Sequence, residues 1–294
     1  MFSKAIEEVA GFTRPIHTII RTYQGNKIIP GSSTLFFVNE EGYAVTCKHV
    51  TDTIAPADNM NQQFQQFKKE RGALGKGAKV NQALRGLELK YKYKPESIIQ
   101  IKNNFVDCVE GPSGFTMHSH PEYDLAIVKF NDFKRILYNG YAKFPKDSTV
   151  AKQGIFLCRL GFPFPEFSNF NYNESTDDIE WTSTGVQATP RFPIEGMITR
   201  FLANEKRMYG IEMSTPGLRG QSGGPLFDTE GIVYGMQFST KHLHLGFDLE
   251  EKEILFQNKP KKVTDYSFLH LGQCIHADVI KEFLREKEVK FYEV

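Results

Sequence analysis

The segment Gly217-Leu-Arg-Gly-Gln-Ser-Gly-Gly-Pro-Leu-Phe227 places one serine, Ser222, on a glycine-flanked turn between two apolar stretches. Glycine adopts backbone conformations that side chains forbid, so Gly220 and Gly223 allow the chain to turn tightly around Ser222. Such a turn can point neighbouring N–H groups the same way, as the stabilisation of an oxyanion requires. A serine among glycines is also typical of a plain turn. The segment by itself therefore suggests a displayed nucleophile and leaves the plain turn open.

Two upstream segments favour the nucleophile. Residues 31–50 predict a strand, a turn at Asn39 to Gly42, and a second strand that ends at His49, where the side chain can face a cleft. Residues 123–130 predict an apolar strand that begins at Asp124. Because burial of an unpaired carboxylate is costly, Asp124 is expected to have a partner.

The order of these residues along the chain discriminates between folds. Histidine, aspartate and serine occur as His49, Asp124 and Ser222, whereas an α/β-hydrolase places its serine first and its histidine last. Residues 225–238, which follow Ser222, predict a hairpin rather than the helix of a nucleophile elbow. The order is that of chymotrypsin-type double barrels.

The combination of segments resembles the trypsin-like (chymotrypsin-fold) serine peptidases, and most closely their bacterial HtrA/Deg-like branch. The similar segments cover most of residues 16–290: 31–38, 42–50, 124–128, 160–163, 196–200, 220–227, 231–235 and 273–287. The resemblance implies a mainly β fold, a double six-stranded antiparallel β-barrel with a helical insertion in the first barrel and a C-terminal helix. We expect a single peptidase domain over residues 1–294 without a PDZ module. Its parts are a first barrel at about 16–135, a second at about 150–275 and the helix at about 276–288.

The same resemblance assigns roles to individual residues. Ser222 would attack the scissile carbonyl, His49 would carry its proton, and Asp124 would orient the imidazole. The backbone N–H groups of Gly220 and Ser222 would form the oxyanion hole. No metal ion and no organic cofactor is expected. The residues expected to line the substrate pocket are Thr215, Pro216, Met236, Gln237 and Phe238.

Specificity is bounded by the residue types at this pocket. The position of the aspartate that selects basic substrates in trypsin is occupied by Pro216, so a small or apolar P1 residue is preferred to a basic one. The acidic residues of a later loop would also be able to enter the pocket: Asp248, Glu250, Glu251 and Glu253.

The chain also departs from secreted trypsins. Gln221 stands where they carry the aspartate that pairs with a new N-terminus, so activation by that ion pair is not expected. The four cysteines have scattered spacings, and Cys47 is interpreted as a small buried side chain. Glu7 and Glu8 interrupt the apolar run that a signal peptide needs, and no window approaches a membrane span. We therefore expect a cytoplasmic protein with no membrane partner.

Two insertions are candidates for specificity or regulation. Residues 57–94 predict polar helices. Within residues 59–94, nine Lys and Arg residues stand against Glu70 and Glu88, a net charge of +7: Lys68, Lys69, Arg71, Lys76, Lys79, Arg85, Lys90, Lys92 and Lys94. The sequence leaves open a solvated flap or a docking surface for an acidic partner or nucleic acid, the latter centred on residues 68–94. Residues 164–193 contain Trp181 and predict a lid or a partner-binding loop.

The sequence supports an endopeptidase that acts on a specific protein target and is regulated by a partner or by loop ordering. A catalytically dormant binding or sensor module with a protease fold is the alternative. The remaining histidines carry no clear motif. A metal site at His118 and His120 lacks helical spacing. His242 and His244 share a face of one strand, where the sequence leaves open that they line the pocket or cap a loop, and His17, His270 and His276 receive no role.

Overall fold

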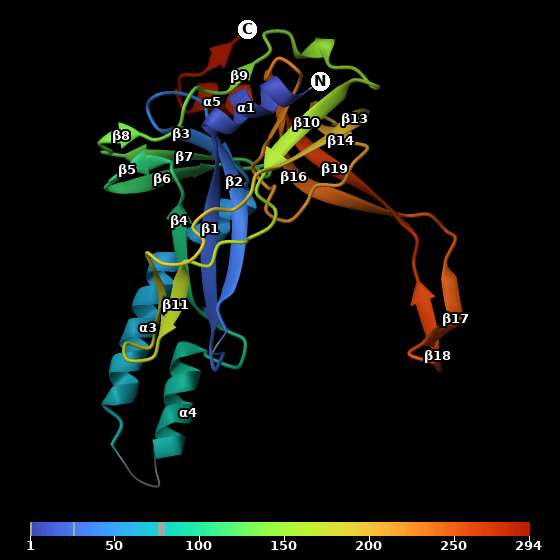
Figure 1. The fold of residues 1–294 in the computed structure, drawn as a ribbon. Coiled ribbons are helices and arrows are strands. Elements are labelled where there is room, and N and C mark those ends of the chain that lie inside the picture. The colour runs from blue at the N-terminus through green and yellow to red at the C-terminus, as the bar shows by residue number, and fades with distance from the viewer. Residues whose placement is uncertain (1, 26, 76–79) are drawn as a thin grey trace.

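Strands follow the β-branched and aromatic runs of the chain and form two large antiparallel sheets. The computed structural model describes residues 2–25, 27–75 and 80–294. Figure 1 shows the two sheets meeting beneath a pair of terminal helices. The first sheet has six strands in the order β4 (Ile98–Phe105), β1 (Thr13–Thr22), β2 (Ile29–Phe37), β3 (Tyr43–Thr46), β7 (Ala126–Asn131) and β6 (Gly114–Ser119). It is a half-barrel, with β4 and β6 at its edges.

The second sheet closes on itself as a six-stranded barrel. Its order is β10 (Phe156–Gly161), β13 (Phe192–Ala203), β14 (Met208–Met213), β19 (Phe268–His276), β16 (Val233–His244) and β15 (Pro225–Phe227). The hairpin predicted after Ser222 is confirmed, because β15 pairs antiparallel with β16. The mainly β, chymotrypsin-like class is likewise confirmed.

Short elements join and close these sheets. The pairs are β5 (Val109–Glu110) with β8 (Arg135–Ile136), and β9 (Lys143–Phe144) with β20 (Tyr292–Glu293), the latter parallel. A single 3-10 turn, η1, spans Ser148–Val150. The C-terminal helix α5 (Ala277–Glu286) lies where the sequence predicts a helix, and its N-terminus is capped by His276, whose side chain accepts the N–H of Asp278. The N-terminal helix α1 (Ser3–Phe12) is not predicted by the sequence reading and packs through Ala5, Val9 and Phe12.

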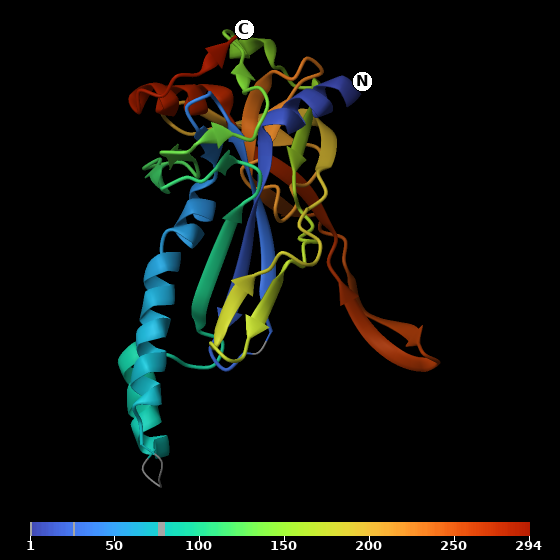
Figure 2. The same ribbon diagram turned by 60° about the vertical axis from the view of Figure 1, so that its left-hand side comes forward.

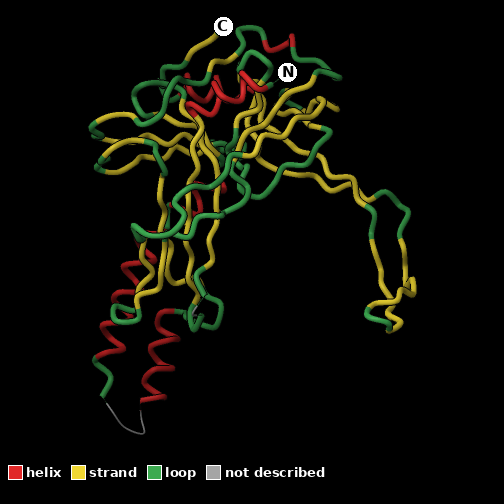
Figure 3. Tube along the Cα trace, viewed as in Figure 1, coloured by secondary structure: helices red, strands yellow, loops and turns green. Residues whose placement is uncertain are grey.

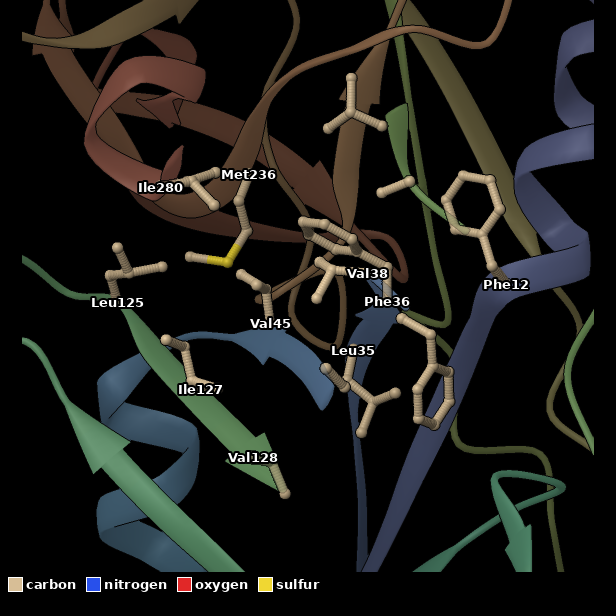
Figure 4. Packing of buried hydrophobic residues seen from close by; sticks show 14 of the residues in the cluster. Phe12, Leu35, Phe36, Val38, Val45, Leu125, Ile127, Val128, Met236 and Ile280 are labelled. Atoms are coloured by element: carbon tan, nitrogen blue, oxygen red, sulfur yellow. The ribbon is translucent and has the colours of Figure 1, made fainter. Parts of the chain in front are cut away.

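The largest apolar core lies between the two sheets and beneath α1 and α5. Figure 4 shows Val45 and Ile127 from the first sheet facing Met236 of β16 and Ile280 of α5. All four side chains are buried. Since burial of one large aliphatic side chain contributes about 1.5–3 kcal/mol, this shared core fixes the two sheets relative to each other.

The predicted helical insertion is a pair of helices, α3 (Ala57–Gly72) and α4 (Val80–Tyr91). Phe64, Phe67 and Leu87 pack with Tyr23 and Ile99, so the insertion has a small core of its own beside the first sheet. Lys76, Gly77 and Lys79, which the sequence analysis includes in the insertion, lie outside the described residues.

The second insertion is a hairpin rather than an irregular lid. Its strands β11 (Phe170–Asn173) and β12 (Asp178–Trp181) lie beside β4, as Figure 2 shows. Lys68 of α3 donates hydrogen bonds to the carbonyl oxygens of Thr176 and Asp177, at 2.7 and 3.1 Å. The two insertions therefore contact each other directly.

A long hairpin arm leaves the second barrel, built from β17 (Leu249–Phe256) and β18 (Lys259–Asp265) at the end of the β16–β19 ladder. Figure 3 shows it as a projection away from both sheets. Every residue of β17 is exposed. In the described ranges, no helix is both long and apolar enough to cross a membrane.

Candidate active site

His49 lies in the first turn of the short helix α2 (Lys48–Ile54). Strand β3 ends at Thr46, and Cys47 keeps an extended conformation at the helix N-cap. The prediction that the strand itself continues to His49 is therefore wrong by one turn. The helix begins before His49 because the backbone groups of this segment pair with one another. The N–H of Thr51 donates to the carbonyl of Cys47 at 3.3 Å.

Asp124 lies in the turn before β7 and binds His49 at two points. Its Oδ2 is 2.6 Å from His49 Nδ1, and its Oδ1 accepts the backbone N–H of His49 at 2.9 Å. Burial raises the pKa of Asp124, but the hydrogen bonds from His49 outweigh it and hold the pKa below its usual value. The carboxylate therefore stays ionised and keeps the imidazole oriented, with Nε2 free for other partners.

The turn that carries Ser222 requires its glycines. Gly220 and Gly223 have φ values of +94° and +88°, in the left-handed region that side chains rarely adopt. A Cβ on Gly223 would overlap the carbonyl oxygen of Thr34, and one on Gly220 would meet the carbonyl oxygen of Phe162. Neighbouring backbone therefore leaves no room for a side chain at either glycine of this turn.

Strand β2 fixes this turn from the first sheet. The N–H of Thr34 donates to the carbonyl of Ser222 at 2.9 Å, and Thr34 Oγ1 donates to the carbonyl of Gly220 at 2.7 Å. From the other side, the N–H of Gly223 donates to the carbonyl of Gln237 at 2.9 Å. Hydrogen bonds from both barrels therefore set the position of Ser222.

Gln221 ties the loop that precedes the serine to the second barrel. Its Oε1 accepts the N–H of Leu218 at 3.1 Å, and its Nε2 donates to the carbonyl of Phe192 at 3.1 Å. Its side chain is fully buried. An amide thus occupies the position where secreted trypsins use an aspartate, and it orders the loop through neutral hydrogen bonds.

His49 and Ser222 line one cleft of about 280 Å³, together with Gly220, Arg219 and residues of β1 and β2. The structure shows no hydrogen bond between His49 and Ser222 in the described part of the chain. Over the same residues, the N–H groups of Gly220 and Ser222 have no acceptor within the chain. Two backbone donors beside the serine are therefore available to a ligand.

A second hollow of about 570 Å³ lies on the other side of Ser222. Pro216, Gln237 and Phe238 line it, as the sequence predicts for the substrate pocket. Gln237 and Phe238 are adjacent in the chain but reach the same hollow because the pairing of β16 with β19 shifts register between Gln237 and Ser239.

Two of the predicted pocket residues lie elsewhere. Met236 is completely buried in the core between the sheets, because successive strand residues point to opposite faces. Thr215 lies behind the hollow, where its carbonyl and hydroxyl oxygens accept the guanidinium of Arg159 at 2.9 and 2.5 Å. Met236 and Thr215 are therefore not among the residues that line this hollow.

Cys47 lies close enough to His49 and Asp124 for one donor atom of each to fall within 4.8 Å of the others. Burial raises the pKa of the Cys47 thiol well above its usual value. The Sγ atom donates to the carbonyl of Gln237 at 3.2 Å. The thiol of Cys47 thus stays protonated and donates to the backbone of Gln237, while the carboxylate of Asp124 binds His49.

The sequence did not indicate several residues at this site, among them Arg219, which lines both hollows, and Thr240 and His270, which line the second. His242, which the sequence left open as a pocket residue, also lines the second hollow. The position of Arg219, three residues before Ser222, is a signal that was available in the sequence. The approach of His270 to His242 was not, because it depends on the pairing of β16 with β19.

Comparisons with known proteins concern the fold and the family of this chain. In the search of curated proteins, no sequence matches this chain. An HtrA-type protease AlgW solved with a decapeptide has a TM-score of 0.50 and 15% identity, covering 97% of this chain and 66% of that chain. The same protease with a tripeptide has a TM-score of 0.48 and 16% identity, covering 97% and 62%. This chain therefore spans about two thirds of the length of these structures, and the likeness concerns the fold.

The model of the trypsin-like peptidase domain matches residues 33–236. These limits enclose His49, Asp124 and Ser222. Since the match extends over more than half of the chain, this protein belongs to the trypsin-like peptidase family.

Proposed function

We propose that this protein hydrolyses peptide bonds in a protein target through Ser222, His49 and Asp124, with an acyl-enzyme intermediate. The observation that carries the proposal is the cleft that His49, held by Asp124, shares with a serine on a turn that only glycines permit.

Each group has a defined part in the reaction. His49 Nε2 accepts the proton of the Ser222 hydroxyl as the oxygen attacks the substrate carbonyl. The same nitrogen then gives that proton to the departing amine, which leaves the acyl group on Ser222. In the second half, His49 activates a water molecule that releases the new carboxyl terminus. Asp124 stabilises the positive charge that the imidazole carries in both steps.

The free N–H groups of Gly220 and Ser222 are the proposed oxyanion hole. They would donate to the oxygen of the tetrahedral intermediate, where each such donor contributes about 3 kcal/mol to transition-state stabilisation. The left-handed conformation of Gly220 makes this position specific to glycine.

A regulatory step is suggested by the hydrogen bond that is not formed between His49 and Ser222 in the described residues. Asp124 and His49 are hydrogen-bonded, whereas His49 and Ser222 are not, over the residues that the structure describes. We propose that substrate or a partner bound at the insertions moves the loop of residues 216–222 so that this bond forms. The same observation favours the second candidate function, a dormant protease fold that binds without cleaving.

The basic insertion is a weaker candidate for a docking surface than its charge suggests. Lys68 and Arg71 are occupied by the β11–β12 turn, and Lys90 pairs with Glu70 at 2.6 Å. Lys69 and Arg85 remain exposed on α3 and α4. A partner with acidic groups, nucleic acid included, would therefore bind the outer faces of these helices.

The cysteines favour a reducing compartment. All four are free and buried, and burial raises the pKa of the Cys274 thiol to about 12. Such thiols persist without pairing in the cytoplasm, which is the location that we propose.

Labelling with a fluorophosphonate probe, read by intact mass, tests the proposed function. We expect one adduct on the wild type and none on Ser222→Ala or His49→Ala. An adduct that persists on Ser222→Ala would refute the assignment of the nucleophile. If no probe reacts with the wild type, even in the presence of protein or nucleic-acid partners, the dormant fold is the correct reading.

A further inference from the structure

The two hollows beside Ser222 have different places in a hydrolysis reaction. His49 lines the smaller one and must reach the departing amine to protonate it. The residue that follows the scissile bond therefore lies on the His49 side. The larger hollow, which Ser222 lines without His49, receives the residue whose carbonyl is attacked, named P1.

Cationic and hydrogen-bonding side chains surround this P1 pocket. Arg219 lies at its rim, exposed, and has no carboxylate partner in the described part of the chain. His242 and His270 lie across from each other on β16 and β19, with their Nδ1 atoms 2.5 Å apart. Over the described residues, the pocket lining contains no aspartate or glutamate.

The histidine pair supplies a donor whichever ring carries the shared proton. One Nδ1 donates to the other, so the accepting ring holds its own proton on Nε2. At least one outward N–H therefore exists at this edge of the pocket.

A buried guanidinium adds positive potential from behind. Arg159 of β10 has no exposed surface, and its side chain donates to Gln237 Oε1 at 2.6 Å and to Thr215. Its Nε has no hydrogen-bond partner and no carboxylate pairs with it, within the residues that the structure describes. Burying a cation without a counter-ion is costly, and Gln237, which accepts a hydrogen bond from this one, lines the pocket.

We propose that this pocket binds the carboxylate of an acidic P1 residue, so that the protein cleaves after glutamate in preference to neutral or basic residues. The inference rests on the proposed peptidase function and names its substrate class. Pro216, Leu218 and Phe238 supply apolar walls for the methylene groups of glutamate, while Arg219 and His242 bind its charge. The carboxylate also supplies the negative charge that the environment of Arg159 lacks.

This inference replaces the small or apolar P1 residue expected from the sequence. The acidic residues that the sequence analysis places near the pocket are directed elsewhere. Asp248 binds His244 at 2.9 Å, and Glu250, Glu251 and Glu253 lie on the exposed arm. The side chains at the pocket are therefore positively charged or neutral, whereas the acidic loop residues would have made the pocket negative.

Paired activity-based probes test the inference. Peptidyl diphenyl phosphonates that differ only at P1, with glutamate, glutamine, valine or lysine, would be compared by the rate of adduct formation at Ser222. We expect the glutamate probe to react about tenfold or more faster than the glutamine probe, the range of a charge-assisted hydrogen bond. Equal reaction, or a preference for valine or lysine, would overturn the inference while leaving the peptidase function intact. A protein that forms no adduct with any phosphonate or fluorophosphonate contradicts the peptidase function itself.

Variants of the exposed cation separate charge recognition from folding. Arg219→Gln should lower the ratio of glutamate to glutamine rates about tenfold, and Arg219→Glu should make lysine the preferred P1 residue. A new preference for lysine in Arg219→Glu cannot result from misfolding, because a misfolded protein would react more slowly with every probe. Arg135→Gln on β8, where Arg135 pairs with Glu110, is the matched control and should keep the wild-type ratio. An unchanged ratio in Arg219→Gln together with His242→Gln would show that these residues do not recognise the charge.

Discussion

Asp124 holds His49 by both of its carboxylate oxygens, one on the imidazole Nδ1 at 2.6 Å and one on the backbone N–H at 2.9 Å. The second bond fixes the start of α2, so the ring orientation and the helix position depend on one side chain. About a quarter of the Asp124 side chain is exposed, which leaves it open to water when the cleft is empty. Substrate that covers the cleft strengthens the pair, because excluding water lowers the local dielectric constant.

Asp124→Asn should lower kcat about 10⁴-fold while the protein remains folded. An amide keeps both contacts only if its oxygen accepts the backbone N–H of His49 and its NH₂ group donates to Nδ1, which favours the wrong tautomer of His49, with the proton on Nε2. Hydrolysis of a P1 glutamate peptide with matched circular dichroism spectra would measure this. Asp52→Asn, on the exposed face of the same helix, is the control and should be close to wild type. A loss of less than tenfold would remove Asp124 from the triad.

Gly223→Ala should destabilise the native state by several kcal/mol. Its φ of +88° is strained for alanine, and the added Cβ would collide with the carbonyl of Thr34 and the hydroxyl of Thr46. Gly86→Ala on α4 provides the contrast, since nothing lies within 4 Å of its Cβ position. That substitution should stabilise the exposed helix by up to about 1 kcal/mol. Urea unfolding of both variants measures the difference, and similar midpoints would contradict the tight-turn account.

Acid should destabilise the protein through His17. This histidine is buried against Phe167, with Nε2 bonded to Thr189 at 2.8 Å, and burial lowers its pKa from 6.5 to about 4. The unfolded state then binds more protons between pH 6.5 and pH 4, so stability is complete above pH 6.5 and falls as the pH drops to 4. The loss should approach about 3 kcal/mol.

His17→Gln tests this account through the pH slope rather than through absolute stability. Urea unfolding at pH 7.5, 5.5 and 4.5 should show a shallower decline in the variant than in the wild type. His118→Gln on β6 is the matched control. Parallel declines in wild type and His17→Gln would assign the acid sensitivity to other groups.

Asp177→Asn should loosen the contact between the two insertions. Asp177 pairs with Arg21 of β1 and Arg71 of α3, each at 2.7 Å. Burial raises the pKa of Asp177, but the hydrogen bonds from Arg71 and Arg21 hold it below its usual value. Loss of this partly buried charge should cost about 1–3 kcal/mol and speed amide exchange in β11 and β12. A double-mutant cycle with Arg71→Gln should show coupling, and purely additive effects would mean that the pair contributes nothing.

Local chemistry explains what the sequence could predict. Gly220 and Gly223 around Ser222 predict a tight turn because only glycine fits there, and the apolar runs at residues 31–50 and 123–130 predict strands. The position of His49 in the first turn of α2, rather than on a strand, was not predicted because short helices lack a strong periodic signal. The helix α1 escaped for the same reason.

Contacts between distant residues explain the rest. The net charge of residues 57–94 is visible in the sequence, but the capture of Arg71 by Asp177 joins positions 106 residues apart. Whether Met236 or Gln237 faces the pocket depends on the register of β16, and a local shift in that register decides it. The hairpin arm and the half-open first sheet likewise depend on pairings that no local pattern encodes.

The carbonyl of Ser222 accepts a hydrogen bond from β2, whereas the neighbouring Gly223 donates to β16. The turn at Ser222 therefore keeps its conformation only while both halves of the molecule are hydrogen-bonded to it. A fragment that contains the second barrel alone would carry the serine but lose the conformation that displays it. The conformation of Ser222 thus depends on how closely the two halves are joined. A change that separates them would distort the turn at Ser222 before the protein unfolded.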